Sequence, residues 1–508
     1  MLCFAGLPSE IHHRIIFHLE SNRDVAALSS QCKALHSLCD MSNRKKYRRV
    51  RITPRISDLD RAFQMLMDIL RKRSLGRYVR HIEYRQTISR YRQYDVKPYE
   101  PKLSEYDMRL LRNATQRAGF TGALQERVLN MLVRESVVGD RLHGTFSDSR
   151  APATYVTQAL TALLVSVSPN VESMAMMPTF YTDFDEDSED SFMHSECALD
   201  LLLREINENP VHKPYLQNLR RVYMINLGDD HSGDGRLYVA MDFIGCLAIL
   251  RNLPSLEWIG TDALAEDDNV LPALGPKCSN VSCIAIHHSA VATSYLTPVI
   301  RSCRALKEFE YSIGGRGSVN GTQPTFNPKT FFLCVLEHKT TLEKLDLDVE
   351  SHIFSTVYRG PGDFEFDEED GRAEAQAYWI ESPPNSFWDQ RGCLKDFEAL
   401  KSLSIGVYFL LYFATGVNNE NDNKIVPLVE YLPPNLEYLC IRGYEKGKRK
   451  RNDAQMDALK ALVDSGSTSL KEIHGVDECI PNAEDIDFPD NYPDLLWKLP
   501  DEWSDEEE

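Results

Sequence analysis

A six-residue stretch decides the fold: Leu342-Glu343-Lys344-Leu345-Asp346-Leu347. Apolar residues hold its first, fourth and sixth positions, and the same frame returns in Leu306–Tyr311, Leu400–Ile405 and Leu436–Ile441. Weaker copies start at Val79, Val171, Leu219, Leu256, Val281 and Leu470. Because alternate residues of a strand share one face, each frame predicts a short strand with one buried side.

Stretches with helical character separate these frames, at Cys197–Asn207, Ala240–Arg251, Lys329–Lys339 and Ala454–Asp464. A single strand–helix unit cannot bury its own apolar face, so neighbouring units must stack. The pattern resembles irregular leucine-rich repeats, although most copies lack the Asn or Cys that usually closes the turn after the strand. We therefore expect an α/β solenoid of short parallel strands alternating with helices. A doubly wound α/β domain is the alternative, but it would not repeat this frame.

The chain has the composition of a soluble globular protein, since 43% of its 508 residues are hydrophobic and 26% are charged. The longest apolar run, Val407–Ala414, is far shorter than the ~20 residues that span a bilayer. The first residues lack the basic leader of a signal peptide, so we expect no membrane partner. The 12 cysteines show no disulfide-framework spacing, which is typical of reduced thiols and predicts a cytoplasmic or nuclear protein.

Charge divides the chain unevenly. The net charge is 57 − 76 = −19, yet residues 1–100 contain 20 Lys and Arg against 10 Asp and Glu. Basic clusters occur at Arg44–Arg51 and Lys446–Arg451. Phosphate binding needs a net positive surface, so we interpret both clusters as solvated and expect no nucleic-acid partner. Acidic runs at Asp183–Asp190, Phe364–Asp370 and Ser504–Glu508 are interpreted as two exposed loops and a tail.

Two short amphipathic helices are predicted near the N-terminus. The first begins at Leu7-Pro8-Ser9-Glu10, because proline is tolerated in a first helical turn. Its apolar stripe is Ile11, Ile15 and Leu19. Asp24 can cap the second helix, whose apolar positions are Val25, Leu28, Cys32, Leu35 and Leu38. A hairpin of this size cannot bury its own faces, so it must pack against a neighbour or a partner.

The order of these residues resembles the F-box motif, in the form Leu-Pro-x-Glu-Ile followed by Asp-Val-x-x-Leu-x-x-x-Cys-Lys. The resemblance covers about residues 4–45; where many F-boxes carry a tryptophan after the Cys-Lys pair, this chain has Ala34, Leu35 and His36. It implies that the hairpin binds a Skp-type adaptor and, through it, a cullin–RING ubiquitin ligase. The residues implied in adaptor binding are Leu7, Pro8, Ile11, Ile15, Leu19 and Leu28, with Leu7 and Pro8 assigned first.

Four regions are predicted: an F-box at 1–45, a connecting helix within 46–75, a solenoid at 76–480 and an acidic tail at 481–508. The connecting helix spans 56–74 and places Leu59, Phe63, Leu66, Met67 and Leu70 on one face. The solenoid includes a mostly helical segment at about 100–165. We expect the tail from about Pro481 onward to be removable without lowering the melting temperature, because Ser504–Glu508 has no core to join.

The sequence offers no set of residues typical of a catalytic centre. It contains no nucleotide-binding loop and no Gly-x-Ser-x-Gly elbow. Cys278, Cys283, His287 and His288 fall within eleven residues, but adjacent histidines lack the spacing of zinc ligands, and strand alternation would send them to opposite faces. We therefore expect no catalytic residue, no metal and no cofactor, and interpret the chain as a protein without enzymatic activity.

The positions between the apolar residues of each frame should point away from the core, onto one shared face of the sheet. Candidates there for binding a substrate are Tyr223, Trp258, Glu308, Glu310, Asp346, Asp348, Tyr438 and Arg442. We expect the four acids to form a compact, uncompensated patch, which would attract a Lys/Arg-rich segment of the substrate. The alternative is an ordinary solvated surface.

Together with the resemblance, these features predict a non-catalytic substrate-recognition subunit of a Skp–cullin–F-box type ubiquitin ligase. Its repeats would bind an unidentified protein substrate. The alternative is an interaction scaffold, with or without the adaptor, that takes no part in ubiquitin transfer.

Overall fold

The structure is a computed structural model of the chain. It describes residues 7–19, 22–85, 103–133, 151–179, 197–226, 237–266, 274–317, 326–350, 384–417, 427–466, 468–483 and 496. These residues form two compact units. The first contains the described residues up to Met174 together with Pro214–Asn218, and the second contains the other described residues from Ala175 onward.

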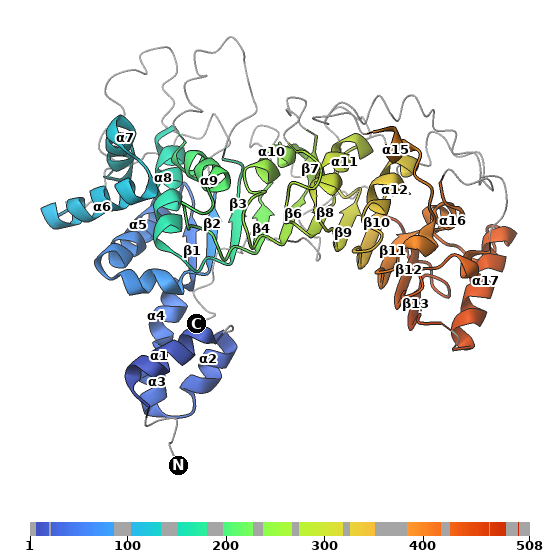
Figure 1. Ribbon diagram of the computed structural model, residues 1–508, viewed down its shortest axis with the longest axis horizontal. Helices are drawn as coiled ribbons and strands as arrows, with labels where there is room; N and C mark the ends of the chain where they lie inside the picture. Colours follow the sequence, from blue (N-terminus) through green and yellow to red (C-terminus); the bar gives the residue numbers. More distant parts are fainter. Residues whose placement is uncertain are drawn as a thin grey trace, which may run out of the picture. The chain divides into compact units, whose positions relative to one another are not determined.

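Eleven strands form a parallel sheet and alternate with helices along the chain (Figure 1). The described strands, including two that lie outside this sheet, are β1 (Arg49–Ile52), β2 (His81–Tyr84), β3 (Ser173–Met176), β4 (Arg221–Met224), β5 (Val239–Ala240), β6 (Trp258–Asp262), β7 (Leu264–Ala265), β8 (Cys283–His287), β9 (Glu308–Ser312), β10 (Lys344–Asp348), β11 (Ser402–Gly406), β12 (Tyr438–Arg442) and β13 (Glu472–His474). Strands β5 and β7 pair separately, and the other eleven lie in the sheet in the order of the sequence.

The helices of the first unit are α1 (Ser9–His18), α2 (Asn22–Ser29), α3 (Lys33–Cys39), α4 (Met41–Arg48), α5 (Ile56–Arg71), α6 (Glu105–Ala118), α7 (Gly122–Val133) and α8 (Ala151–Val167). Those of the second unit are α9 (Ala198–Glu208), α10 (Phe243–Ala248), α11 (Thr293–Ser302), α12 (Pro328–Leu336), α15 (Asn385–Trp388), α16 (Val407–Thr415) and α17 (Lys450–Asp464). Among the described residues, no helix is both long and apolar enough to cross a membrane.

Three short helices open the first unit, where the sequence predicted two. Helices α1, α2 and α3 enclose a small core of Ile16, Val25 and Cys39. The predicted second helix is interrupted at Cys32, whose backbone is extended and whose side chain is exposed. Asp24 lies inside the first turn of α2 and does not precede the helix. The predicted hairpin is therefore corrected to a three-helix arrangement.

The helix predicted at 56–74 is present as α5, which ends at Arg71, and all five residues of its predicted apolar face are buried. It lies in the chain between β1 and β2, which pair in parallel, with Val50 opposite Ile82. Helix α5 is thus the helix of a strand–helix–strand unit. The sheet begins at Arg49, earlier in the chain than the sequence predicted. Helices α6, α7 and α8 account for the predicted helical segment at about 100–165 and pack on one another.

All ten predicted frames contain a strand of the sheet, and each strand begins two residues after the first apolar residue of its frame. Strand β10, for example, begins at Lys344 within the frame that starts at Leu342. Four predicted helical stretches are confirmed with shifted ends as α9, α10, α12 and α17. Helices α11 and α16 were not predicted.

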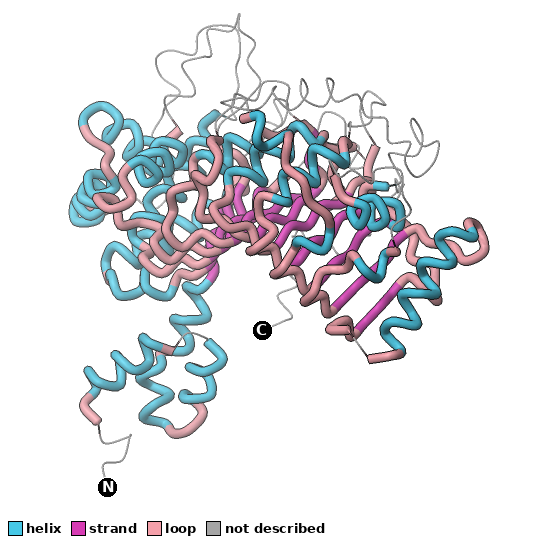
Figure 2. Tube along the Cα trace, turned by 45° about the vertical axis from the view of Figure 1, so that its right-hand side comes forward, coloured by secondary structure: helices cyan, strands magenta, loops and turns pink. Residues whose placement is uncertain are grey.

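Strand register explains why the frame repeats. Phe309 lies opposite Leu345, which lies opposite Leu403, and Leu403 lies opposite Leu439, so one fully buried row crosses β9 to β12. Helices α10, α11, α12 and α16 lie on one side of the sheet (Figures 1 and 2). Phe309 of the buried row faces this side, because its ring packs on Phe331 of α12 with centroids 5.6 Å apart. Aromatic rings also pack between neighbouring helices, as in Phe332 of α12 and Phe413 of α16, whose ring centroids are 4.4 Å apart.

Candidate protein-interaction face

The other side of the second unit's sheet, which we call the open face, carries the residues that alternate with the buried row. Parallel register aligns these residues from strand to strand. One row runs through Arg221, Trp258, Cys283, Glu308, Lys344, Ser402 and Tyr438, and a second runs through Tyr223, Gly260, Ala285, Glu310, Asp346, Ser404 and Cys440. All eight predicted substrate-binding residues lie on this face.

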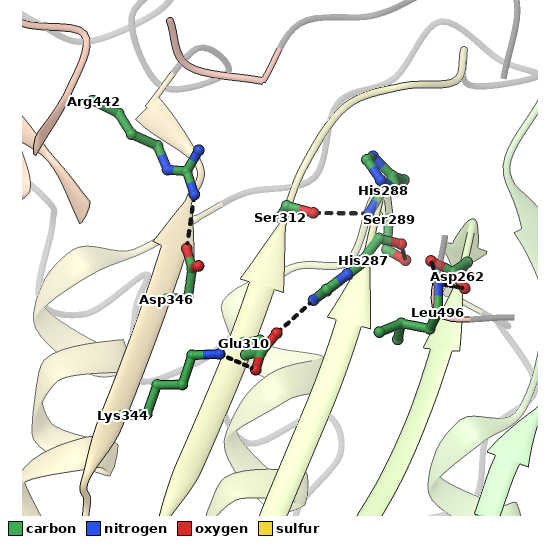
Figure 3. A network of polar contacts seen from close by, with 10 residues as sticks. All are labelled: Asp262, His287, His288, Ser289, Glu310, Ser312, Lys344, Asp346, Arg442 and Leu496. Carbon is green, nitrogen blue, oxygen red and sulfur yellow. Dashed lines mark hydrogen bonds and ion pairs between the residues drawn. The ribbon is translucent and has the colours of Figure 1, made fainter. Parts of the chain in front are cut away.

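Glu310 is the centre of a charged network (Figure 3). Nε2 of His287 on β8 donates to its carboxylate at 3.0 Å, and Nζ of Lys344 on β10 donates at 2.6 Å. These hydrogen bonds, that from His287 first, lower the pKa of Glu310 to about 2 against the effect of burial. Burial alone would lower the pKa of His287, but Glu310 raises it above its ordinary value. Glu310 is therefore a compensated carboxylate.

Two further acids of the predicted patch share one arginine. Nη2 of Arg442 lies 3.1 Å from Asp346, and Nη1 of the same side chain lies 3.5 Å from Asp348. Asp348 is only 4% exposed. Burial raises its pKa to about 6, although Arg442 and the main-chain amide of Ala483 act in the opposite direction. Arg442 and the Ala483 amide therefore only partly offset the effect of burial on the pKa of Asp348.

The prediction of an uncompensated acidic patch is therefore wrong in its charge. The four acids do lie on adjacent strands, with Glu308 opposite Lys344 and Glu310 opposite Asp346. Three of them have a basic partner within 4.0 Å, and among the described residues only Glu308 of the four forms no ion pair. The face is consequently a mixed, paired surface, and its attraction for a basic segment is weaker than the sequence predicted.

The aromatic candidates differ in their access to solvent. Trp258 is partly exposed and carries the guanidinium of Arg221 over its ring, 4.6 Å from the centroid. Tyr438 is also partly exposed and contacts the ring of His474 on β13, with centroids 5.5 Å apart. Tyr223 is buried, and its hydroxyl donates to Asp262 on β6 at 2.7 Å. Trp258 and Tyr438 can contact a partner directly, whereas Tyr223 orients Asp262.

Residues beyond β13 return to the open face. Ile480 bridges in parallel to Arg442, and its carbonyl accepts a hydrogen bond from the Gly443 amide at 2.8 Å. The Ala483 amide donates to both oxygens of Asp348 at 3.0 Å. The Leu496 amide donates to Asp262 at 3.2 Å. Ala483 and Leu496 belong to the tail that was predicted to be removable from about Pro481 onward, so part of that tail contacts the fold. Trp497, Trp503 and Ser504–Glu508 lie outside the described residues, as do the acidic runs Asp183–Asp190 and Phe364–Asp370.

The six residues predicted for adaptor binding have different environments in the first unit. Pro8 is exposed, Ile11 is 40% exposed, and Leu7 and Ile15 are partly buried. Leu19 and Leu28 pack instead against the core formed by Ile16, Val25 and Cys39. Among the described side chains of α1, His12 and Ile16 are buried, and Ile16 lies one position after Ile15 of the predicted stripe. Leu7, Pro8 and Ile11 are therefore the apolar residues of this set best placed to contact a partner.

The cysteine–histidine group of the sequence does not converge on one point. His287 belongs to the open face and is bound to Glu310, whereas His288 is buried and has a positive φ of 47°. Their rings meet edge to face with centroids 6.2 Å apart. Within the part of the chain that the structure describes, no three His, Cys, Asp or Glu side chains are grouped as metal ligands.

Comparison by sequence finds no protein-family model that matches the chain and no curated protein that is significantly similar to it.

Proposed function

We propose that this chain is a non-catalytic recognition subunit, in which the N-terminal helices bind an adaptor and the open face binds a second protein. The observation that carries the proposal is the open face itself. Seven consecutive strands, β4 to β12 without β5 and β7, align two rows of residues on the side opposite the helices, and every member of the first row, from Arg221 to Tyr438, is exposed or partly exposed. A surface with partly exposed Trp, Tyr and Arg residues has the composition of protein–protein interfaces.

The N-terminal helices support the adaptor half of this proposal. Leu7, Pro8 and Ile11 are partly or fully exposed, although Ile16, Val25 and Cys39 form a core beside them. An exposed apolar group at the start of a small helical unit is typical of a docking surface. The order of these residues resembles an F-box, so the adaptor we propose is of the Skp type, linked to a cullin–RING ubiquitin ligase.

In this function the chain performs no chemistry of its own. Ubiquitin transfer would take place on other subunits, and this chain would raise the local concentration of the substrate and orient it. The strand frame resembles irregular leucine-rich repeats, and the resemblance is consistent with such a recognition role. We therefore propose a protein substrate bound on the open face.

The test is co-purification of the tagged full chain with a Skp-type adaptor and a cullin. Replacing Leu7 and Pro8 by alanine should lower adaptor recovery about thirty-fold, the effect of ~2 kcal/mol of lost interface energy. Lys45→Ala, at an exposed position of α4, is the matched control and should recover the adaptor as wild type does. Unchanged adaptor binding by the double variant would refute the assignment.

An interaction scaffold remains the second candidate, and the same experiment separates it. A scaffold would recover the adaptor, or another partner, without cullin. A recognition subunit should recover both, and should lose both together when Leu7 and Pro8 are replaced.

A further inference from the structure

The last residues of six consecutive strands of the second unit form one row across the open face, which we call the carboxyl-end row. Its members are Asp262, His287, Ser312, Asp348, Gly406 and Arg442, which end β6, β8, β9, β10, β11 and β12. Register pairs Asp262 with His287, Ser312 with Asp348, and Gly406 with Arg442. The row therefore crosses the strands at their carboxyl ends.

The chain's own C-terminal segment, described at Ile480–Ala483 and at Leu496, contacts this row at three points. It bridges to Arg442 through Ile480, to Asp348 through Ala483 and to Asp262 through Leu496. The order of contacts follows the row from β12 towards β6. Figure 3 shows Leu496 beside Asp262 at one end of the polar network and Arg442 at the other.

Chain length is compatible with this path. Asp348 and Asp262 are separated by three strand spacings, about 14 Å at ~4.8 Å per strand. The chain between Ala483 and Leu496, 496 − 483 = 13 residues, can extend over about 43 Å. The number of residues between Ala483 and Leu496 is therefore sufficient to join these two contacts; residues 484–495 lie outside the described residues.

Asp348 and Asp262 bind main-chain groups of the segment, and we call these two contacts the anchors. Asp348 accepts the Ala483 amide on both carboxylate oxygens, and Asp262 accepts the Leu496 amide on the oxygen that also accepts from the Tyr223 hydroxyl. Both aspartates are 4% exposed. Removal of the segment takes one N–H donor from each carboxylate, while Arg442 still pairs with Asp348 and the Tyr223 hydroxyl still donates to Asp262. Each carboxylate can then accept an N–H from another chain at a fixed position of the row.

We propose that the open face is a peptide-binding surface, that the chain's C-terminal segment is its intramolecular ligand, and that the partner is an extended protein segment whose main-chain N–H groups replace those of Ala483 and Leu496. Extended peptides that bind to sheets are held mainly by main-chain hydrogen bonds, and in this proposal the acceptors are the Asp262 and Asp348 carboxylates. This inference rests on the proposed function in one respect, because it assigns the partner to the same open face.

Competition between the tethered C-terminal segment and a partner depends on the effective concentration of the segment. A short linker gives an intramolecular ligand an effective concentration in the millimolar range. A partner must therefore bind with more contacts than the segment makes, and the partly exposed Trp258 and Tyr438 of the first open-face row provide them. Access to the face is thus restricted in the isolated chain.

Hydrogen–deuterium exchange of the full chain tests the anchors. The Leu496 amide should exchange at least ~10-fold more slowly than in a free synthetic peptide of residues 478–500, since hydrogen-bonded amides exchange only on opening. Asp262→Ala should abolish this protection and leave that of Ala483 unchanged. Tyr223→Phe keeps the Asp262 carboxylate and should keep Leu496 protected. Exchange of wild-type Leu496 at the rate of the free peptide would overturn the proposal.

Peptide binding tests the competition, with the labelled 478–500 peptide as the probe. Leu496→Pro removes the donor N–H of the tethered segment and leaves the open face intact, so this full-chain variant should bind the probe at least ~10-fold more tightly than wild type. Leu496→Ala retains the N–H and should bind as wild type does. Equal binding by the proline variant and wild type, or no binding by either, would overturn the proposal.

These assays contain no adaptor, cullin or ubiquitin. A negative result in these assays would therefore not affect the adaptor-binding proposal. If the adaptor-binding proposal were refuted, the hydrogen-exchange experiment would still test the contacts of Ala483 and Leu496.

Discussion

Asp346 on β10 and Arg442 on β12 form an ion pair of 3.1 Å that spans the intervening strand β11. The arginine crosses two strand spacings, about 9.6 Å, and also reaches Asp348. The positive charge of Arg442 thereby compensates two acids that the sequence alone had presented as an uncompensated patch. The charge of the open face depends on this arginine.

Arg442→Gln should destabilise the second unit by about 2 kcal/mol at pH 8, because it leaves two poorly solvated carboxylates without their cation. The loss should be smaller at pH 5. Asp348 has a pKa of about 6 and is largely protonated there, and loss of Arg442 would raise that pKa further. Urea unfolding at the two pH values measures the difference. Lys471→Ala, which breaks an exposed ion pair with Glu437, should cause no measurable change; an effect as large as that of Arg442→Gln would contradict this account.

Glu308 is the one acid of the patch without an ion pair among the described residues, so its reversal changes the charge of the face without breaking a contact. Glu308→Lys should weaken binding of a short Lys/Arg-rich probe peptide several-fold at ~20 mM salt, and the difference should shrink at ~200 mM salt as screening increases. Fluorescence anisotropy measures both. Glu398→Lys, at an exposed position outside the strands, changes the net charge by the same amount and in the same direction, and controls for net charge. If neither the charge reversal nor the salt concentration changed binding of the probe peptide, a basic partner would have to bind elsewhere.

Glu350 predicts a second pH effect. The side chain is 1% exposed, its Oε1 accepts the Phe409 amide at 2.7 Å at the start of α16, and its carboxyl lies so close to Gly406 that a Cβ there would overlap it. Burial raises the pKa of Glu350 to about 8, although the amides of Phe409 and Tyr408 lower it. Because this folded-state pKa lies above the unfolded value of 4.5, its contribution to stability is complete below pH 4.5 and is lost as the pH rises through 8.

Glu350→Gln should accordingly flatten the fall in unfolding free energy between pH 5 and pH 8.5, with a gain on the order of 1–2 kcal/mol at the higher pH. The amide retains an oxygen for Phe409 and cannot ionise. Urea unfolding of Glu398→Gln, an exposed carboxylate, gives the control, which should keep the slope of wild type. An unchanged slope in Glu350→Gln would show that the carboxyl is ionised in the folded chain.

The sequence predicted the ten strands because their apolar frame is a local signal, readable without knowledge of neighbours. The same frame occurs at Tyr47-Arg48-Arg49-Val50-Arg51-Ile52, which contains β1, but its arginines led to the interpretation of a solvated basic cluster. Strand alternation also placed all eight candidate residues on one face. Their positions followed from the period of a strand alone.

Pairing could not be predicted in the same way. Lys344, His287 and Arg442 reach acids on other strands, so their contacts depend on adjacency and on side-chain length across one or two strand spacings. The contacts of the C-terminal segment are even harder to predict from the sequence. Ala483 and Leu496 bind through main-chain amides, and every residue except proline has a main-chain N–H. On α1, the stripe of Ile11, Ile15 and Leu19 was one helical position away from the buried Ile16, a difference that only the position of α2 and α3 decides.

Ile16 and Ile11 therefore form a matched pair for the N-terminal helices. Ile16→Ala should destabilise them by about 3 kcal/mol, because Ile16 is 3% exposed and its removal leaves a cavity. Ile11→Ala, at 40% exposure, should leave stability within ~0.5 kcal/mol but lower adaptor recovery about tenfold. Hydrogen exchange over α1 to α3 and adaptor co-purification separate the two effects. Adaptor recovery that depends on Ile16 alone would show that folding, and not contact, limits binding.

Two truncations test how far the C-terminal segment belongs to the fold. A chain ending at Ala483 keeps the bridge of Ile480 to Arg442 and the amide that Asp348 accepts. Of the contacts made by described residues it loses that of Leu496, and Asp262 then still accepts the Tyr223 hydroxyl. Its melting temperature should stay within about 2 °C of wild type. A chain ending at Cys479 also removes Ile480–Ala483, which leaves Asp348 without its amide donor and Gly443 without its acceptor. An unsatisfied buried carboxylate costs about 1–3 kcal/mol, so we expect this chain to melt about 4 °C or more below the first. Differential scanning calorimetry of both proteins makes the comparison, and equal melting temperatures would show that Ile480–Ala483 is dispensable for stability.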